Sequence, residues 1–180
     1  MQTEQLKLKL QSLGALRPEA WEMICQEMGS VALKPDQSFI RKAGTLSYLA
    51  HGVLKEYDAQ DRYQPAIINF LGANDALITR EQNRTHYLKA CTECIIYYWD
   101  FEALERLYAQ FRELKIIYDS LCAGYDHRIK LRVRLLELPV SGRIEIFKTV
   151  FMRLLPYLKK KDMANYLHLN YSHFIKIWNK

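Results

Sequence analysis

The last 24 residues of the chain, YLKKKDMANYLHLNYSHFIKIWNK, combine side-chain types that suit contact with a polyanion. They contain five lysines and one Asp, together with Asn, Ser and His side chains. Lysine binds phosphates through its charge, and Asn, Ser, His and Lys can hydrogen-bond the edges of nucleic-acid bases. These side-chain types indicate nucleic-acid binding for residues 157–180.

The charge of the chain is concentrated in the same region. Residues 126–180 carry 12 Lys and Arg against 4 Asp and Glu, while residues 1–125 carry 14 against 16. Such asymmetry between segments favours a polyanionic partner for the C-terminal part. A basic face that is simply solvated is the alternative, and charge alone does not separate the two.

The pattern of this segment predicts two short amphipathic helices, KKKDMANYL and NYSHFIKIW, joined by a tight turn. Ala164 supplies the small residue that such a pair needs in its first helix, and Asn170 suits the N-cap of the second. The residues expected to lock the helices together are Met163, Leu167, Leu169, Phe174 and Ile177. This is the arrangement of a helix-turn-helix, whose second helix enters the major groove of DNA.

Within this arrangement the DNA-contacting residues can be assigned. Three lysines would flank the phosphate backbone, and the cap and exposed side chains of the second helix would face the bases. The predicted DNA-binding residues are Lys159, Lys160, Lys161, Asn170, Tyr171, Ser172, His173 and Lys176.

Two features count against a DNA-reading helix. His168 stands at the turn position where glycine usually tolerates a positive φ, although histidine does visit that region. Ile175 and Trp178 are large apolar residues on or near the reading face, where they would pack on a neighbour instead. They favour an alternative, a module that binds a ligand or a protein and carries a degenerate helix-turn-helix.

The preceding residues fall into three parts that would position this helix pair. Residues 1–30 are predicted to be helical, with Pro18 at a helix start. Residues 31–99 read as short strands separated by turn signals, which suggests an antiparallel barrel or roll. From Phe101 the period becomes helical, and Pro139, Ser141 and Gly142 mark a boundary before the last helices.

An apolar stripe in the helical region predicts a dimer helix. Its residues recur at steps of three and four: Leu104, Leu107, Phe111, Leu114, Tyr118, Leu121 and Tyr125. We expect the stripe to pair with a second copy, because one helix on a roll would leave much of it uncovered. Packing on the roll of the same chain is the alternative, and a break near Gln110 could divide the stripe between two helices.

Other classes of protein are disfavoured. No apolar run approaches the ~20 residues of a membrane span, and the N-terminus lacks the apolar core of a secretion signal, so a cytoplasmic protein is expected. Cys91 and Cys94 form a CxxC motif in an apparent strand, which would point the two sulfurs to opposite faces and prevent them from sharing a metal. No set of acid, base and nucleophile can be assembled, so we expect no enzymatic activity and no catalytic residues.

The full pattern resembles the cyclic-AMP receptor protein/FNR (Crp/Fnr) family of bacterial transcription regulators. Gly52-Val53-Leu54-Lys55-Glu56-Tyr57 is similar to the family's "G-x-hydrophobic-Lys/Arg-x-Tyr" strand. MANYLHLNYSHFIKIWNK is similar to its reading helices: Ala164, Tyr166, Leu167 and Ile177 agree, whereas His168, Ile175 and Lys176 depart.

The resemblance implies an α+β fold with three parts. They are an N-terminal β roll of the cyclic-nucleotide-binding type (a jelly roll, or double-stranded β-helix), a long dimerisation helix at about 101–137, and a C-terminal helix-turn-helix. The implied domains are a sensor of residues 1–137 and a DNA-binding domain of residues 138–180.

The family's effector site is a phosphate cassette, and the match to it is partial. The resemblance implies Gly72, Asp75, Arg84 and Thr85 as effector-binding residues. Ala73 stands where the family has the Glu that bonds ribose, and His86 replaces a small residue and would crowd the pocket. We therefore expect no cyclic nucleotide. We also expect no iron–sulfur cluster, because residues 1–24 contain no cysteine.

Together these observations predict a homodimeric regulator that reads a palindromic operator in double-stranded DNA. As implied by the resemblance, it would carry an effector roll of unknown or absent ligand, and RNA polymerase is a further expected partner. No membrane partner and no metal are expected.

Overall fold

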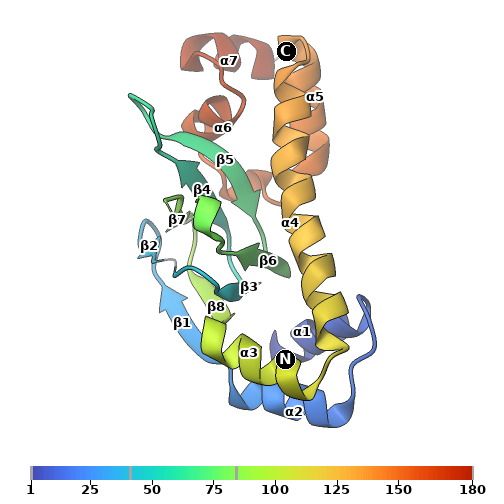
Figure 1. Ribbon diagram of the computed structural model, residues 1–180. Coiled ribbons are helices and arrows are strands. Elements are labelled where there is room, and N and C mark those ends of the chain that lie inside the picture. The colour runs from blue at the N-terminus through green and yellow to red at the C-terminus, as the bar shows by residue number, and fades with distance from the viewer. Residues whose placement is uncertain (1, 41, 84, 180) are drawn as a thin grey trace.

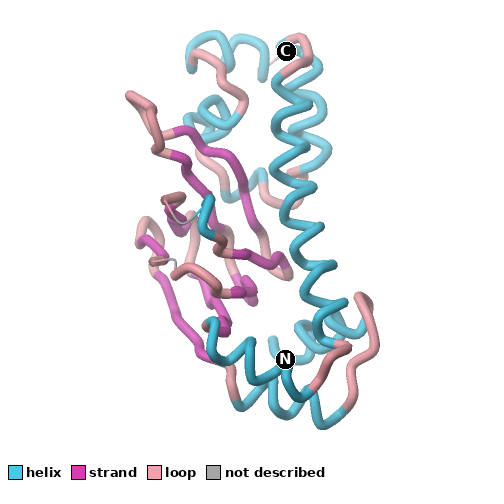
Figure 2. The backbone as a smooth tube through the Cα atoms, viewed as in Figure 1, coloured by secondary structure: helices cyan, strands magenta, loops and turns pink. Residues whose placement is uncertain are grey.

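The computed structural model describes residues 2–40, 42–83 and 85–179. In Figure 1 the strands form a roll on one side of the molecule, and the long helix α4 runs along the other. The two ends of the chain lie at opposite ends of the molecule, and Figure 2 shows helices gathered at both of these ends. The fold is α+β, as predicted.

Eight strands form the roll in the described part of the chain. They are β1 (Gly29–Leu33), β2 (Ser38–Phe39), β3 (Leu46–His51), β4 (Leu54–Asp58), β5 (Ala66–Leu71), β6 (Asp75–Ile78), β7 (Tyr87–Ala90) and β8 (Cys94–Trp99). They pair antiparallel in two sheets, with the orders β1-β8-β3-β6 and β2-β7-β4-β5. Leucines from strands of both sheets, among them Leu49, Leu54 and Leu88, form a buried apolar cluster of the roll.

Two details of the roll differ from the sequence-based predictions. Strand β6 lies within residues 31–99, which were predicted to form short strands, but it was not delimited as a separate strand. Cys91 and Cys94 do not lie on one strand: β7 ends at Ala90, and the connection to β8 carries Cys91. The metal argument based on opposite faces of a strand was therefore wrong. Among the described residues, no group of three or more His, Cys, Asp or Glu could hold a metal ion.

The turn between β3 and β4 requires its glycine. Gly52 has φ +95°, and a Cβ there would lie 2.2 Å from the Glu93 carbonyl oxygen. Both the backbone conformation and the space exclude a larger residue. This is the turn that opens the quoted Gly-Val-Leu-Lys-Glu-Tyr motif.

The helical region after the roll is divided into two helices. Helix α3 spans Phe101–Gln110 and is capped by Asp100, whose side chain accepts a hydrogen bond from the Ala103 N–H. Helix α4 spans Leu114–Leu136. The predicted break near Gln110 is confirmed. Among the described helices, none is both long and apolar enough to cross a membrane.

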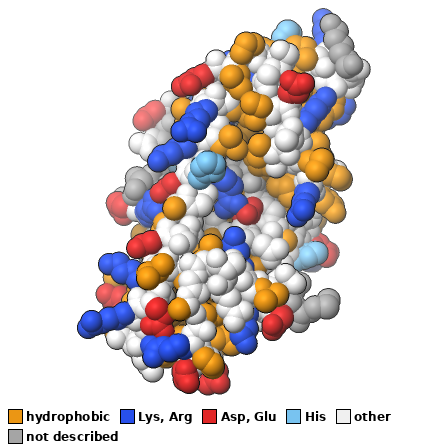
Figure 3. Space-filling model, turned by 90° about the vertical axis from the view of Figure 1, so that its right-hand side faces the viewer, with side chains coloured by type: hydrophobic (Ala, Val, Ile, Leu, Met, Phe, Trp, Pro, Cys, Tyr) orange, Lys and Arg blue, Asp and Glu red, His pale blue; other side chains and the backbone are white. Residues whose placement is uncertain are grey.

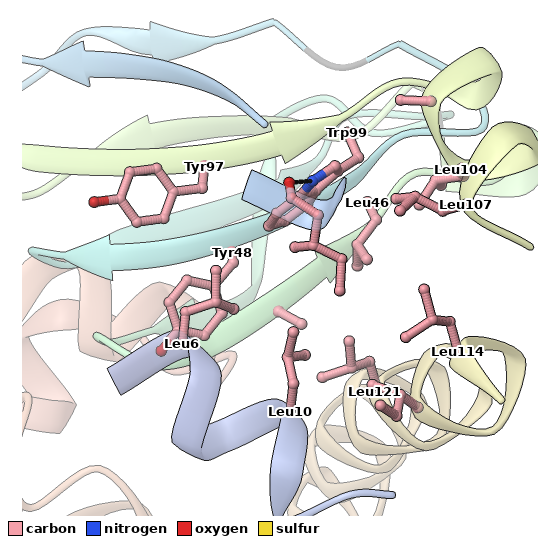
Figure 4. Close-up of a cluster of buried hydrophobic side chains, with 14 of the residues drawn as sticks. Leu6, Leu10, Leu46, Tyr48, Tyr97, Trp99, Leu104, Leu107, Leu114 and Leu121 are labelled. Atoms are coloured by element: carbon pink, nitrogen blue, oxygen red, sulfur yellow. Dashed lines mark hydrogen bonds between the residues drawn. The ribbon is translucent and has the colours of Figure 1, made fainter. Parts of the chain in front are cut away.

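The apolar stripe of α3 and α4 is buried within its own chain. The N-terminal helices α1 (Gln2–Gln11) and α2 (Pro18–Gln26) cover it together with the sheet that contains β3 and β8. Figure 4 shows Leu6 and Leu10 of α1 pointing toward Tyr48, Leu114 and Leu121. The predicted pairing of this stripe with a second copy is therefore wrong, because the residues it needs are already covered. Tyr118, which is partly buried, packs against the same cluster.

The C-terminal part consists of α5 (Val140–Val150), a short 3-10 helix η2 (Leu155–Tyr157), α6 (Lys160–Tyr166) and α7 (Tyr171–Trp178). A second 3-10 helix, η1 (Glu81–Asn83), lies within the roll. Phe70 of β5 contacts Phe147, Phe151 and Tyr166 with ring centroids 5.3–6.0 Å apart. One apolar cluster therefore spans the domain boundary predicted at residue 137, which itself stays a prediction.

Candidate nucleic-acid interface

Helices α6 and α7 are joined by a tight turn over residues 167–170. His168 has φ 54°, the left-handed conformation that was expected at this position. The Leu169 N–H donates to the Ala164 carbonyl at 2.9 Å, and the His168 N–H donates to the Asn165 carbonyl at 3.0 Å. These bonds satisfy carbonyls at the end of α6, so histidine serves where glycine is usual.

Asn170 caps the second helix of the pair. Its Oδ1 accepts hydrogen bonds from the backbone N–H groups of Ser172 at 3.0 Å and His173 at 3.5 Å. These two groups have no partner within the helix, so the cap fixes where α7 begins. The prediction from sequence is confirmed.

The apolar residues of α7 face the rest of the chain. Phe174 is fully buried, and its ring lies 5.1 Å from that of Trp178. The Lys148 ammonium lies 4.5 Å from the Trp178 ring, and Ile175 packs against the same cluster. The two residues that counted against a reading helix therefore pack within their own chain.

The polar residues of α7 face solvent. Tyr171, Ser172, His173 and Lys176 are all exposed, and they follow the Asn170 cap within two turns of helix. The structure thus brings five of the predicted residues together on the outer side of one helix. These side chains can donate and accept hydrogen bonds at base edges.

The three consecutive lysines diverge. Lys159 Nζ lies 3.6 Å from Asp36 Oδ2 in the turn between β1 and β2, and this charge lowers the pKa of Asp36. Lys160 Nζ donates to Asn179 Oδ1 at 3.2 Å, near the end of α7. Lys161 is exposed. The lysines therefore do not form one patch, since the first faces the roll and the second faces the far end of α7.

Helix α6 is attached to the roll by an ion pair that the sequence did not reveal. Lys55 Nζ on β4 lies 2.6 Å from Asp162 Oδ2, and both side chains are largely buried. Burial by itself lowers the pKa of Lys55, but hydrogen bonds to Asp162 and Tyr57 more than offset it, and the net pKa is raised. Lys55 is therefore charged in the folded protein.

A neutral side chain strengthens the same attachment. Asn165 Oδ1 accepts from the Ile67 N–H at 2.6 Å, and its Nδ2 donates to the Pro65 carbonyl at 3.1 Å. On the other side of α6, Arg132 Nε of α4 donates to the Tyr166 carbonyl at 3.1 Å. The orientation of the helix pair is thus fixed from both the roll and the long helix.

Similarity to known proteins is evident in structure and absent in sequence. No protein-family model matches the chain, and no curated protein matches it. FixK2 from Bradyrhizobium japonicum superposes with a TM-score of 0.70 at 13% identity, covering 84% of this chain and 83% of its own. A Crp/Fnr family regulator from Eubacterium rectale gives a TM-score of 0.70 at 12% identity. The superposition covers 90% of this chain and 82% of the regulator. The c-di-GMP responsive global regulator CLP of Xanthomonas campestris gives a TM-score of 0.66 at 16% sequence identity. The superposition covers 91% of this chain and 90% of CLP.

The chain has the Crp/Fnr fold. The order of roll, long helix and C-terminal helix pair that the sequence predicted is the order of this fold. Identities of 16% or less in these three proteins show the architecture alone, so the function has to be argued from the residues.

The described residues of the predicted Crp/Fnr effector cassette, Gly72, Asp75 and Thr85, are not gathered in one site. The Gly72 N–H donates to Asp75 Oδ2 at 2.8 Å, and Asp75 forms an ion pair with Arg128 of α4. Thr85 is exposed in the connection before β7, and Arg84 lies outside the described residues.

Strand register separates the two halves of the cassette. Leu54 of β4 lies opposite Leu71 and Ala90, whereas Tyr57 lies opposite Ile67 and Tyr87. Gly72 follows Leu71, and Thr85 comes shortly before Tyr87. Because each residue advances a strand by about 3.3 Å, Gly72 and Thr85 lie at opposite ends of this sheet. The predicted joint site is wrong for these residues.

A buried polar cluster was also missed. The Glu56 side chain on β4 is fully buried, and its Oε1 accepts a hydrogen bond from the Tyr125 hydroxyl of α4 at 2.5 Å. His86 Nδ1 lies 3.3 Å from the same oxygen, and Asn69 Nδ2 donates to Oε2 at 3.4 Å. The only sequence signal was a Glu within a predicted strand, and its partners in the cluster lie 13, 30 and 69 residues away.

Proposed function

We propose that the chain is a DNA-binding transcription regulator of the Crp/Fnr family that binds a palindromic operator as a homodimer. The observation that carries this proposal is the division of α7 into two faces. Its apolar residues pack on α5 and α6, and its polar residues are exposed after a capped start. The side chains of the exposed face are of types that can hydrogen-bond base edges, which is what a reading helix requires.

The roles of the residues follow from their positions. Tyr171, Ser172, His173 and Lys176 would contact base edges, and Asn170 would hold the start of α7 toward the groove. Lys159, Lys160 and Lys161 would contact phosphates. Of these lysines, Lys161 is the one best placed, because Lys159 and Lys160 have neighbours within the chain.

Dimerisation is assigned to the outer face of α4, which replaces the buried stripe. Ile116 is 63% exposed. Apart from the backbone of its own helix and its chain neighbours, no atom of the described residues lies within 4 Å of a Cβ placed on Gly124, so a second helix can approach closely there. Farther along the helix this face carries Lys130 and Arg134. Two copies would then present their α7 helices to half-sites about 34 Å apart.

The roll of this regulator is proposed to act without a cyclic nucleotide or other cofactor. The Glu56 carboxylate and its partners fill buried space between the roll and α4. Buried side chains that are bonded to one another leave no room for a nucleotide where they lie. As a regulator the protein would act in the cytoplasm on promoters used by RNA polymerase, and it would catalyse no reaction itself.

The decisive test is to select fragments of sheared genomic DNA with the purified protein at about 0.1 M salt, where binding through phosphates alone is weakened. We expect a two-fold symmetric motif with half-sites one turn of DNA apart. The matched control is the double variant His173→Ala/Lys176→Ala, which should lose the motif and keep its fold. If the wild-type protein enriches no motif, the proposal is wrong, and the alternative of a ligand- or protein-binding module becomes the better one.

A further inference from the structure

A groove of about 790 Å³ lies between the roll and the C-terminal helices. It is lined by the β3–β4 turn, the β5–β6 turn, α4, and the segment from the end of α5 through η2. Pockets that hold small molecules have volumes of this order and often lie between domains. The groove is separate from the exposed face of α7 and from the buried Glu56 cluster.

One wall of the groove is apolar and open to solvent. Val150, Met152 and Tyr157 are 46%, 66% and 55% exposed, and Phe151 lies buried behind them. Figure 3 views the side of the molecule on which α4 and α5 lie, and hydrophobic side chains gather over its upper part. Exposed apolar residues concentrated beside a groove indicate a surface that a partner covers.

The charged residues of the groove favour an anion. Of the described residues that line it, Asp75 is the one acid, and it is already paired with Arg128. Arg128 Nη2 also donates to the Ala76 carbonyl at 3.2 Å, while its buried Nε has no partner among the described residues. Arg153 is exposed at the rim, and no ion pair to it is found in the described part of the chain. No acidic side chain of the described residues therefore compensates its positive charge.

We propose that this groove binds a small amphipathic monoanion, a carboxylate carried on an apolar chain or ring. The carboxylate would lie at Arg153, because Arg128, the other arginine of the groove, is already paired with Asp75. The apolar part would cover Val150, Met152 and Tyr157. Such a ligand would touch two turns of the roll and the segment that leads into α6, so it would stabilise the attachment of the helix pair to the roll.

The first test is calorimetric titration of the full chain with sodium octanoate, in the absence of DNA. We expect saturable binding with one site per chain, and at least tenfold weaker binding of the uncharged 1-octanol. Arg153→Gln should weaken octanoate binding at least fivefold. The matched control is Arg112→Gln, which removes an exposed arginine between α3 and α4, away from the groove, and should leave the affinity unchanged.

A second variant tests the location by filling the groove. Val150→Trp adds an aromatic side chain at a partly exposed position, so it should abolish octanoate binding with little change in the urea unfolding midpoint. Absence of saturable octanoate binding by the wild-type chain would overturn the inference. So would equal binding of octanoate and octanol, or unchanged binding by Arg153→Gln or Val150→Trp. Because no DNA is present, the outcome is independent of whether the chain recognises an operator.

Discussion

Helix α7 and the Glu56 cluster both carry polar side chains, but they use them in opposite ways. On α7, Ser172, His173 and Lys176 point to solvent. In the cluster, Glu56 is fully buried and bonded to side chains of β5, α4 and the connection before β7. Polar groups in water keep their hydrogen-bonding capacity for a partner, whereas buried polar groups must be satisfied within the chain.

The comparison separates recognition from stability. Substitutions on the outer face of α7 should change DNA binding and leave the free energy of unfolding nearly constant. Substitutions in the Glu56 cluster should do the reverse. The attachment of α6 to the roll lies between these two regions and should affect both.

The largest effect on stability is expected from Glu56→Ala. It removes the acceptor of the Tyr125 hydroxyl and leaves buried polar groups without their partner, so the free energy of unfolding should fall by about 3 kcal/mol. Urea unfolding followed by circular dichroism measures this free energy of unfolding. Glu105→Ala, on the exposed side of α3, is the matched control and should change it by less than about 0.5 kcal/mol. A loss as small as that of the control would mean that the cluster does not stabilise the fold.

Asp162→Asn should have the next largest effect. It leaves the buried Lys55 ammonium with a neutral partner, and the free energy of unfolding should fall by about 2 kcal/mol. Because the pair holds α6 against the roll, operator affinity should also decrease. Urea unfolding and fluorescence anisotropy on the selected operator measure the two quantities. Reduced stability with unchanged affinity per folded molecule would show that the roll does not orient the helix pair.

Lys176→Ala tests the reading face itself. It should weaken binding to the selected operator by about 1–3 kcal/mol and have little effect on nonspecific DNA. The unfolding midpoint should not change, because Lys176 is exposed. Lys34→Ala removes another exposed lysine, near the β1–β2 turn, and serves as the control. Equal losses on both kinds of DNA would assign Lys176 to a phosphate contact instead of a base.

The smallest effect is expected at Asn170, the residue of the reading face with a structural role. Asn170→Ala removes the cap of α7 and should lower the free energy of unfolding by about 1 kcal/mol. Asn170→Asp keeps a capping oxygen and should retain stability, yet its negative charge should weaken DNA binding through repulsion from phosphates. If Asn170→Asp binds the operator as tightly as the wild type, the start of α7 does not approach DNA.

Features that depend on neighbours in the sequence were predictable. The Asn170 cap, the turn at His168 and the break near Gln110 each arise from residues within one or two helical turns. The turn at Gly52 is local in the same sense. For these features residue type and spacing contain the necessary information, because the bonds that form them span only a few residues.

Features that join distant segments were not predictable. The apolar residues from Leu104 to Tyr125 recur with a helical period. That period is the same whether a second chain covers them or α1 and α2 of the same chain do, so it does not identify the partner. The cassette residues matched a motif in order, but strand register places Gly72 and Thr85 at opposite ends of a sheet. Likewise, Lys55 and Asp162 are 107 residues apart, and nothing in the sequence around either residue indicates that the two form an ion pair.

The sequence by itself determined the order of the roll, the helices after it and the helix pair. It also determined the residues on the outer face of α7, since helical period and capping follow from local chemistry. The tertiary structure decided which apolar faces are covered within the chain and which polar groups are buried. It also decided how α6 attaches to the roll and where a groove remains open. These properties depend on which surfaces meet when the chain closes on itself, and no local pattern specifies that.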